Sequence, residues 1–247
     1  MKAKDILIVP LDVPDIEAPV VINQLKGVVS RFKINVRLFT ALGTTIVKMV
    51  LDSGAKVFLD LKFHDIPETV GGAALAAAQL GVDMFNIHCS GGKPMMSATV
   101  LATHRLIAEG QANSRPKVFG VTLLTSLDTE TLMGVGLQPL FNLEDTVVTM
   151  ALAAKDCGLD GVVASPQETA RIRGVCGPKF QIINPGIRMP GVKKDDQIRI
   201  GTVEKAVEGG ASFLVVGRPI LEAKNRLDAT LMFLDEIERV LFLQAEC

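Results

Sequence analysis

Short apolar runs alternate with stretches of helical character about eight times along this 247-residue chain, and this alternation is the feature that most limits its fold. Strands that alternate with helices form parallel sheets covered by helices. About eight such units in a chain of this length predict an α/β fold, a single-domain (β/α)8 TIM barrel spanning residues 1–247. The last unit is expected to be one helix, from Pro219 to Gln244. A doubly wound sheet is the alternative, but it requires a glycine-rich turn after the first strand, where this chain has Asp12-Val13-Pro14.

The composition excludes several classes of partner. Hydrophobic residues make up 48% of the chain, enough for one large core, and the formal net charge is −1, so no global charge attracts nucleic acid or a membrane surface. The charged start of the chain is no signal peptide, and no apolar run is long enough to span a membrane. Four cysteines without a Cys-x-x-Cys pair predict reduced thiols in a cytoplasmic protein, and three histidines lack close metal-ligand spacing.

Residues 58–69 concentrate charge at the end of the third expected strand. If side chains alternate regularly along that strand, Asp60 and Lys62 point to the same face. Asp65 follows in the turn, before a helix that Pro67 opens. A carboxylate and an ammonium that face inward are costly to desolvate without partners, so this stretch indicates a functional site rather than an ion pair that only fixes the fold.

Further polar residues fall where the other strands are expected to end, which is where the active sites of such barrels lie. They are Asp12, Lys33, His88, Thr125, Ser126, Arg188, Gly217 and Arg218. Three of them also have simpler structural explanations: Asp12 as a helix cap, His88 as a core histidine and Ser126 as a turn cap. Lys33 is harder to explain in that way, because an unpaired buried ammonium would lose its proton or destabilise the fold.

These residues predict two charged subsites. Lys33, Asp60, Lys62 and Asp65 can alternate in sign, which offsets desolvation and holds one lysine in place as a proton donor. Residues 215–219 offer backbone N–H groups near a helix N-terminus and the guanidinium of Arg218, an arrangement that suits a phosphate.

The loop 187–200 precedes the phosphate run and contains few apolar residues. Arg188 and Gln197 in this loop could close over the same anion, so we expect a phosphate-gripping lid. A plain surface loop without that role is the alternative.

Together these motifs resemble the bacterial type of the orotidine 5′-phosphate decarboxylase family. The signature is Asp60-Leu-Lys-Phe-His-Asp-Ile-Pro-Glu-Thr69. The other landmarks, in order, are Leu11-Asp12, Phe32-Lys33-Ile34, His88 with Ser90-Gly91-Gly92, Leu124-Thr125-Ser126, Pro185-Gly186-Ile187-Arg188, Asp195-Asp196-Gln197 with Arg199, and Val216-Gly217-Arg218-Pro219. The Asp-x-Lys-x-x-Asp core alone is shared with related sugar-phosphate decarboxylases and synthases, whereas the longer strings are more specific.

The resemblance implies conversion of orotidine 5′-phosphate to UMP and carbon dioxide, the last step of de novo pyrimidine nucleotide synthesis, without a metal or organic cofactor. It implies that Lys62 protonates the C6 carbanion and that Asp60 sits against the departing carboxylate. Lys33 would tie Asp60 to the ribose, and Asp12 would accept from a ribose hydroxyl.

The same resemblance implies a homodimer with shared active sites. Asp65, with Ile66 and Thr69, would reach the site of the neighbouring subunit. Thr125 and Ser126 would read the pyrimidine edge, and the phosphate would be bound by Arg188, Gln197, Gly217 and Arg218. His88 is expected among the residues around the substrate.

Two positions depart from the family pattern. The family usually has glycine after Phe-Lys-Ile, where this chain has Asn35. Asparagine tolerates a left-handed backbone better than most residues, so a left-handed turn is expected to survive there. Pro10 lacks an N–H for the ladder, so the first strand is expected to bulge or end early.

Two other functions stay open on the residues alone. One is a metal-assisted sugar-phosphate decarboxylase or aldolase that uses Asp60 and magnesium, although two neighbouring ammonium groups repel a divalent cation. The other is a non-catalytic sensor of nucleotide phosphates on the same fold.

Overall fold

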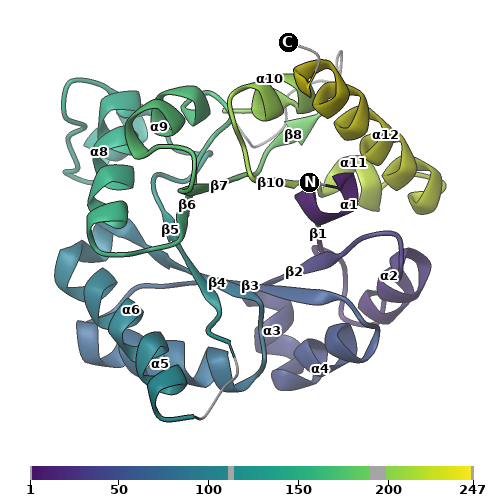
Figure 1. Cartoon of the computed structure of the whole chain (residues 1–247), viewed down its shortest axis with the longest axis horizontal. Helices are drawn as coiled ribbons and strands as arrows, with labels where there is room; N and C mark the ends of the chain where they lie inside the picture. The colour runs from purple at the N-terminus through teal and green to yellow at the C-terminus, as the bar shows by residue number, and fades with distance from the viewer. Residues whose placement is uncertain (1, 111–113, 190–198, 246–247) are drawn as a thin grey trace.

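The computed structural model describes residues 2–110, 114–189 and 199–245. Within these ranges, parallel strands close into a barrel in the order β1-β10-β7-β6-β5-β4-β3-β2, with helices around it (Figure 1). The barrel strands are β1 Leu7–Pro10, β2 Arg31–Asn35, β3 Lys56–Phe63, β4 Met84–His88, β5 Lys117–Val121, β6 Gly161–Val163, β7 Gln181–Asn184 and β10 Phe213–Val215. The predicted (β/α)8 barrel is confirmed.

Helix α1 Ala3–Ile6 precedes β1, and the other helices follow strands and surround the barrel (Figure 1). These other helices are α2 Ala18–Leu25, α3 Val36–Leu42, α4 Thr44–Asp52, α5 Pro67–Gln79, α6 Gly92–Ala108, α7 Thr129–Gly134, α8 Leu143–Asp156, α9 Thr169–Cys176, α10 Val203–Glu208, α11 Arg218–Leu221 and α12 Arg226–Ala245, with a 3-10 turn η1 at Cys89–Gly91. The expected start of α5 at Pro67 is confirmed.

The expected single helix from Pro219 to Gln244 is wrong, because the structure has two helices there, α11 and α12. Asn225 lies between them, and its side-chain oxygen accepts from the backbone N–H groups of Leu227 and Asp228. An asparagine that binds these N–H groups caps a new helix start. The apolar pattern continues across the break, so the pattern alone could not locate it.

Two apolar layers hold the barrel together. Inside it, Phe58, Phe119 and Phe213 pack ring against ring, with centroids 6.4 Å and 6.2 Å apart for the two successive pairs, and neighbouring strands add Ile8 and Met84. The larger layer lies between the strands and the surrounding helices. Because side chains fill the interior, any cavity must open at an end of the strands.

The amino ends of the strands are closed by ion pairs. Arg31 donates from Nε and Nη2 to Oδ2 of Asp83, at 2.9 Å and 2.7 Å, and its guanidinium lies 4.9 Å from the ring centroid of Phe213. Lys117 Nζ is 5.7 Å from the same centroid. Arg31, Asp83 and Lys117 therefore each have a protein partner at this end of the barrel.

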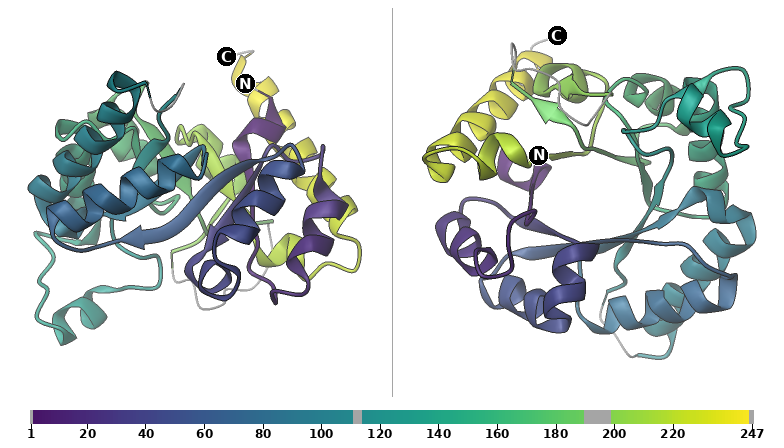
Figure 2. Two further views of the ribbon diagram at one scale, coloured as in Figure 1. Left: turned by 90° about the horizontal axis from the view of Figure 1, so that it is seen from below. Right: turned by 180° about the vertical axis from the view of Figure 1, so that it is seen from behind.

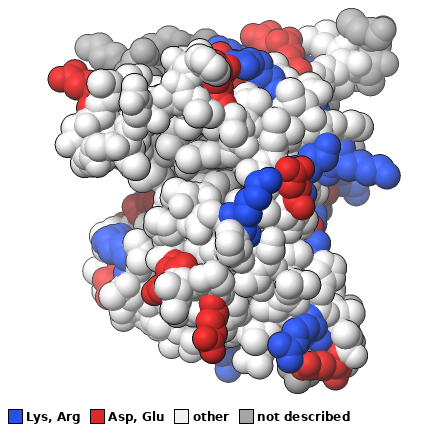
Figure 3. Space-filling view, turned by 90° about the vertical axis from the view of Figure 1, so that its left-hand side faces the viewer, with Lys and Arg blue, Asp and Glu red and all other residues white. Residues whose placement is uncertain are grey.

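The connection between β5 and α8, which contains α7, projects from the body of the molecule (Figure 2). On the side drawn in Figure 3, acidic and basic side chains lie scattered among uncharged ones, with no broad patch of one sign. Among the described helices, none is long and apolar enough to cross a membrane. Cys89, Cys157 and Cys176 are free thiols.

Candidate active site

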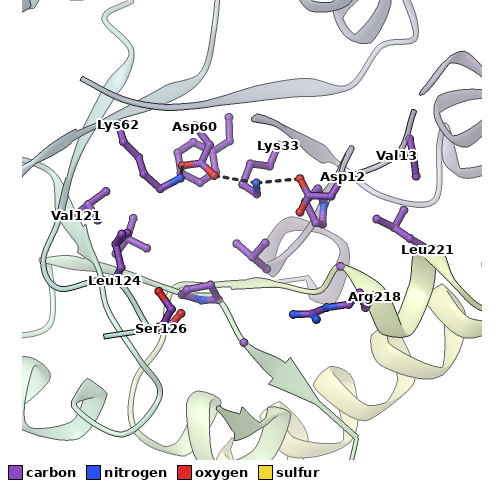
Figure 4. A pocket seen from close by; sticks show the side chains of 18 of the residues that line it. Asp12, Val13, Lys33, Asp60, Lys62, Val121, Leu124, Ser126, Arg218 and Leu221 are labelled. Atoms are coloured by element: carbon purple, nitrogen blue, oxygen red, sulfur yellow. Dashed lines mark hydrogen bonds and ion pairs between the residues drawn. The ribbon is translucent and has the colours of Figure 1, made fainter. Parts of the chain in front are cut away.

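Four charged side chains form a row at the carboxyl ends of β1, β2 and β3 (Figure 4). Nζ of Lys33 lies 2.8 Å from Oδ2 of Asp60 and 3.4 Å from Oδ1 of Asp12. Nζ of Lys62 lies 2.6 Å from Oδ1 of Asp60. The side chains of Asp60 and Lys33 are about nine-tenths buried, whereas Lys62 keeps 34% of its side chain exposed. Asp60 therefore joins two ammonium groups, of which that of Lys62 is the more exposed.

Asp60 and Lys62 point to the same side, as expected, but the third strand is not regular at this point. The register of β3 against β4 shifts between Leu59 and Phe63, and Lys62 has φ of +52°. Asn86 on β4 accepts from the backbone N–H of Lys62 at 2.8 Å and donates to Oδ1 of Asp60 at 2.6 Å. This buried amide holds both the irregular backbone and the carboxylate that pairs with Lys62.

Asn86 was not predicted as a site residue from the sequence. Its signal was an amide between Phe85 and Ile87, in the apolar part of that strand. A buried amide requires partners, and the nearest polar groups across the sheet are those of β3.

Pairing keeps the row charged although it is buried. Burial alone would raise the pKa of Asp60, but Lys33 and Lys62 hold that pKa below its usual value. Burial alone would lower the pKa of Lys33, but Asp60 and Asp12 raise it above the usual value. Both groups therefore carry their charges at neutral pH, and the row presents fixed charge to the cavity.

The row lines one wall of a cavity of about 670 Å³. Arg218 lies on the opposite side of the cavity from this row, and Ser126 lies on a third side (Figure 4). Arg188 and Thr125 also line the cavity. The structure thus brings together predicted residues from β1, β2 and β3 and from the segments that follow β5, β7 and β10.

Arg218 is the first residue of α11, directly after Gly217. A Cβ on Gly217 would lie 3.1 Å from Cγ of Pro10, a close contact, so glycine lets this turn approach the end of β1. The strand pair β8 Ile187–Arg188 and β9 Gly201–Thr202 joins the two ends of the predicted lid. Gln197 lies outside the described residues.

A buried arginine holds the segment that carries Thr125. Arg199 donates from Nη2 to the carbonyls of Leu123 and Leu124, both at 3.0 Å, and from Nη1 to Glu168 at 2.5 Å. Its own backbone N–H donates to the carbonyl of Thr125 at 3.3 Å. Arg199 was noted only as part of a motif and Glu168 was missed, because the pair is formed by loops 31 residues apart.

Four predicted residues do not line this cavity in the described chain. Asp65, Ile66 and Thr69 are exposed, and Asp65 accepts from the backbone N–H of Ile66 at 2.6 Å. His88 is half-buried, with its ring centroid 5.4 Å from that of His64. Burial, His64 and Lys62 lower the pKa of His88.

The two departures from the family pattern have different outcomes. The last residue of β1 is Pro10, but Leu11 still donates its N–H to the carbonyl of Lys33 at 2.8 Å, so pairing with β2 continues past the proline. The left-handed turn at Asn35 is wrong. Asn35 is extended, with φ of −84° and ψ of 168°, because its side chain caps α3.

Within the described residues, no three His, Cys, Asp or Glu side chains are grouped as a metal site would require. Both oxygens of Asp60 already accept from ammonium groups.

Comparison with known proteins gives the family. The model of the orotidine 5′-phosphate decarboxylase / HUMPS family matches residues 5–233. The chain belongs to this family.

Relatives in this family match almost the whole chain. The orotidine 5′-phosphate decarboxylase of Moorella thermoacetica is 46% identical over 244 residues, covering 97% of this chain and 95% of the relative. That of Syntrophotalea carbinolica is 43% identical and covers 98% of each. The crystal structure of orotidine 5′-phosphate decarboxylase from Lactobacillus acidophilus has a TM-score of 0.81 and 34% identity, covering 94% of this chain and 99% of that one.

Proposed function

We propose that this protein converts orotidine 5′-phosphate to UMP and carbon dioxide as a carboxy-lyase of pyrimidine nucleotide synthesis in the cytoplasm. The observation that carries the proposal is the ammonium of Lys62, held 2.6 Å from a carboxylate that a second lysine also binds, at the wall of the cavity. The family match and the relatives' names support the same reaction.

Loss of carbon dioxide from C6 of the pyrimidine leaves an electron pair on carbon with no electron sink in the ring. Such a charge is stabilised best by cations that are already oriented. Asp60 lies against the leaving carboxylate and destabilises it by charge repulsion, while Lys62 faces the developing carbanion. As the C6–carboxylate bond breaks, Lys62 gives its proton to C6, and carbon dioxide departs.

The proposed phosphate site is far from the bond that breaks. Arg188, Gln197, Gly217 and Arg218 bind the phosphate in this proposal, and the lid 187–200 closes on it. Binding energy gained there orients the base against Lys62. Thr125 and Ser126 contact the pyrimidine, Asp12 and Lys33 the ribose, and His88 lies near the substrate.

The proposed assembly is a homodimer in which Asp65, Ile66 and Thr69 enter the neighbouring active site. Their exposure at the end of β3, outside the cavity of their own chain, supports this arrangement. Asp65 would then complete the alternation of charge next to the partner's Lys62.

The reaction is tested by following the absorbance change of orotidine 5′-phosphate with EDTA present. We expect rapid turnover by the wild type and its loss in Lys62→Ala. The control Lys117→Ala removes a lysine at the other end of the barrel and should retain activity. Robust activity in Lys62→Ala would overturn the role of Lys62.

The same assay separates the other two functions. Turnover of a sugar phosphate that EDTA abolishes and magnesium restores would indicate the metal-assisted enzyme. Tight binding of UMP without turnover would indicate the sensor.

The phosphate site is tested by Arg218→Ala. We expect kcat/KM to fall by a factor equivalent to roughly 2 to 5 kcal/mol of lost transition-state stabilisation. A loss below about tenfold would contradict the phosphate assignment.

Shared active sites are tested by mixing two inactive variants, Lys62→Ala and Asp65→Ala, under conditions that exchange subunits. A mixed dimer has one site with both defects and one intact site, so roughly a quarter of the wild-type activity should return. No recovery in exchanged dimers would show that each chain completes its own site.

A further inference from the structure

The side chain of Asn35 links the start of α3 to the carboxylate of Asp12. Its Oδ1 accepts from the backbone N–H of Leu38 at 2.8 Å, and its Nδ2 donates to Oδ1 of Asp12 at 2.7 Å. Because the amide oxygen is occupied by the helix cap, only the NH2 group can face Asp12. The helix therefore fixes the orientation of the amide, and the amide fixes the carboxylate.

Lys33 is the second donor near Asp12, but it lies farther away. Nζ of Lys33 is 3.4 Å from Oδ1 of Asp12 and 2.8 Å from Asp60. The short hydrogen bond to Asp12 therefore comes from Asn35.

The second oxygen of Asp12 lies on the cavity side. Oδ2 would be 3.9 Å from a Cβ placed on Gly217, a residue of the cavity wall, and no hydrogen bond to Oδ2 is found in the described part of the chain. The Asp12 side chain is 46% exposed. A carboxylate held by one oxygen can offer the other to a hydroxyl without first losing rotational freedom.

We propose that Asn35 is a positioning residue that orients Asp12 toward a sugar hydroxyl of the ligand, and so contributes to recognition of ribonucleotides. This inference rests on the proposed function, and it concerns a position where this chain departs from the glycine usual in its family. Asn35 acts through Asp12, so its effect falls on ligand binding and is specific to one hydroxyl.

The test compares variants that separate the cap from the contact with Asp12. Asn35→Asp keeps an acceptor for α3 but places a second carboxylate beside Asp12, and Asn35→Ser keeps a capping hydroxyl but cannot span to Asp12. Asn142→Asp is the matched control. Asn142 caps α8 by accepting from the N–H of Asp145 at 2.8 Å, and it donates to the carboxylate of Asp145 at 2.8 Å, away from the cavity.

Steady-state kinetics are measured with orotidine 5′-phosphate and with its 2′-deoxy and 3′-deoxy analogues. We expect Asn35→Asp to raise KM for the parent about tenfold, with kcat changed less than about twofold. Asn35→Ser should raise KM less. For the one analogue that lacks the hydroxyl bound by Asp12, KM should hardly change between wild type and variant. Asn142→Asp should leave KM unchanged for all three compounds.

An unchanged KM in Asn35→Asp, or a rise equally large for both deoxy analogues, would overturn the inference. Melting temperatures show whether Asn35→Asp folds, and Asn35→Ser replaces it if not. If wild type fails to turn over orotidine 5′-phosphate, the proposed function fails, and calorimetry with UMP and its two deoxy analogues then tests Asn35 alone. Hydroxyl-dependent weakening of UMP binding by Asn35→Asp would support the inference, and its absence would overturn it.

Discussion

At the amino end of the barrel, Arg31 donates twice to Asp83 and covers the ring of Phe213, while at the carboxyl end Lys33 and Lys62 converge on Asp60. Both ends hold charges in a largely apolar barrel, and both satisfy the need of a buried charge for a partner. At the amino end, cations, carboxylate and aromatic ring satisfy one another. At the carboxyl end, one carboxylate is shared between two cations, and Lys62 borders a cavity.

The difference shows that a buried ion pair indicates function only when its geometry leaves a charge to act on a ligand. Arg31 and Asp83 are as closely paired as Lys62 and Asp60, at 2.7 Å and 2.6 Å. What distinguishes the second pair is the cavity beside it and the irregular backbone of Lys62.

The largest expected effect tests this contrast with one change at each end. Asp60→Asn should lower kcat on the order of 10² to 10³-fold, because it removes the shared anion that orients both lysines. Asp83→Asn should leave kcat unchanged and lower the free energy of unfolding by about 1–3 kcal/mol. Steady-state kinetics and urea unfolding measure the two quantities. A kcat loss in Asp83→Asn comparable to that in Asp60→Asn would remove the contrast.

An intermediate effect is expected from two arginines that each bind loop carbonyls. Arg199 holds the carbonyls of Leu123 and Leu124 at the carboxyl end, and Arg173 holds those of Gly177, Phe180 and Gly210 at the amino end.

Lysine cannot replace the guanidinium fork in either place, so both lysine variants should lose about 1–3 kcal/mol of stability. Only Arg199→Lys should also raise KM, by roughly tenfold, because it loosens the segment that carries Thr125 and Ser126. Kinetics and unfolding of both variants provide the check. A similar rise of KM in Arg173→Lys would mean that any loss of stability disturbs the site.

The smallest expected effect is on how the free energy of unfolding depends on pH. Burial, His64 and Lys62 lower the pKa of His88 in the folded protein. As the pH falls below about 6.5, the unfolded chain binds a proton at this histidine before the folded chain does, so stability falls with pH.

The variant His88→Gln removes that contribution, which cannot exceed about 1.4 kcal/mol per pH unit. We expect its unfolding free energy to decline less steeply than that of the wild type between about pH 6.5 and 5. Urea midpoints measured at several pH values in this range give the slopes. Parallel slopes for the two proteins would contradict the assignment.

The barrel and the charged row were predictable, because parallel strands bring their carboxyl ends to one rim. Lys33, Asp60 and Lys62 each follow from an apolar strand that ends in charge. The contacts that orient them were not predictable in this way. Asn86 and the pair Glu168 and Arg199 act across strands or between loops, so their partners depend on register and packing rather than on spacing in the chain.

Asn35 shows a second limit of prediction from the sequence. Its residue type suggested a left-handed turn, but the same side chain caps α3 and binds Asp12, and these two contacts favour an extended backbone. The backbone preference of asparagine was overridden by hydrogen-bond partners that are not adjacent to Asn35 in the sequence.

The backbone of Lys62 has a consequence for how such a protein would respond to selection. Lys62 is the non-glycine residue with positive φ in the described chain, a conformation that glycine adopts at lower cost. Selection for stability alone would therefore favour glycine at the position that the proposed reaction most requires. A population maintained for expression without need for the enzyme should lose this lysine early, while the fold around it persists.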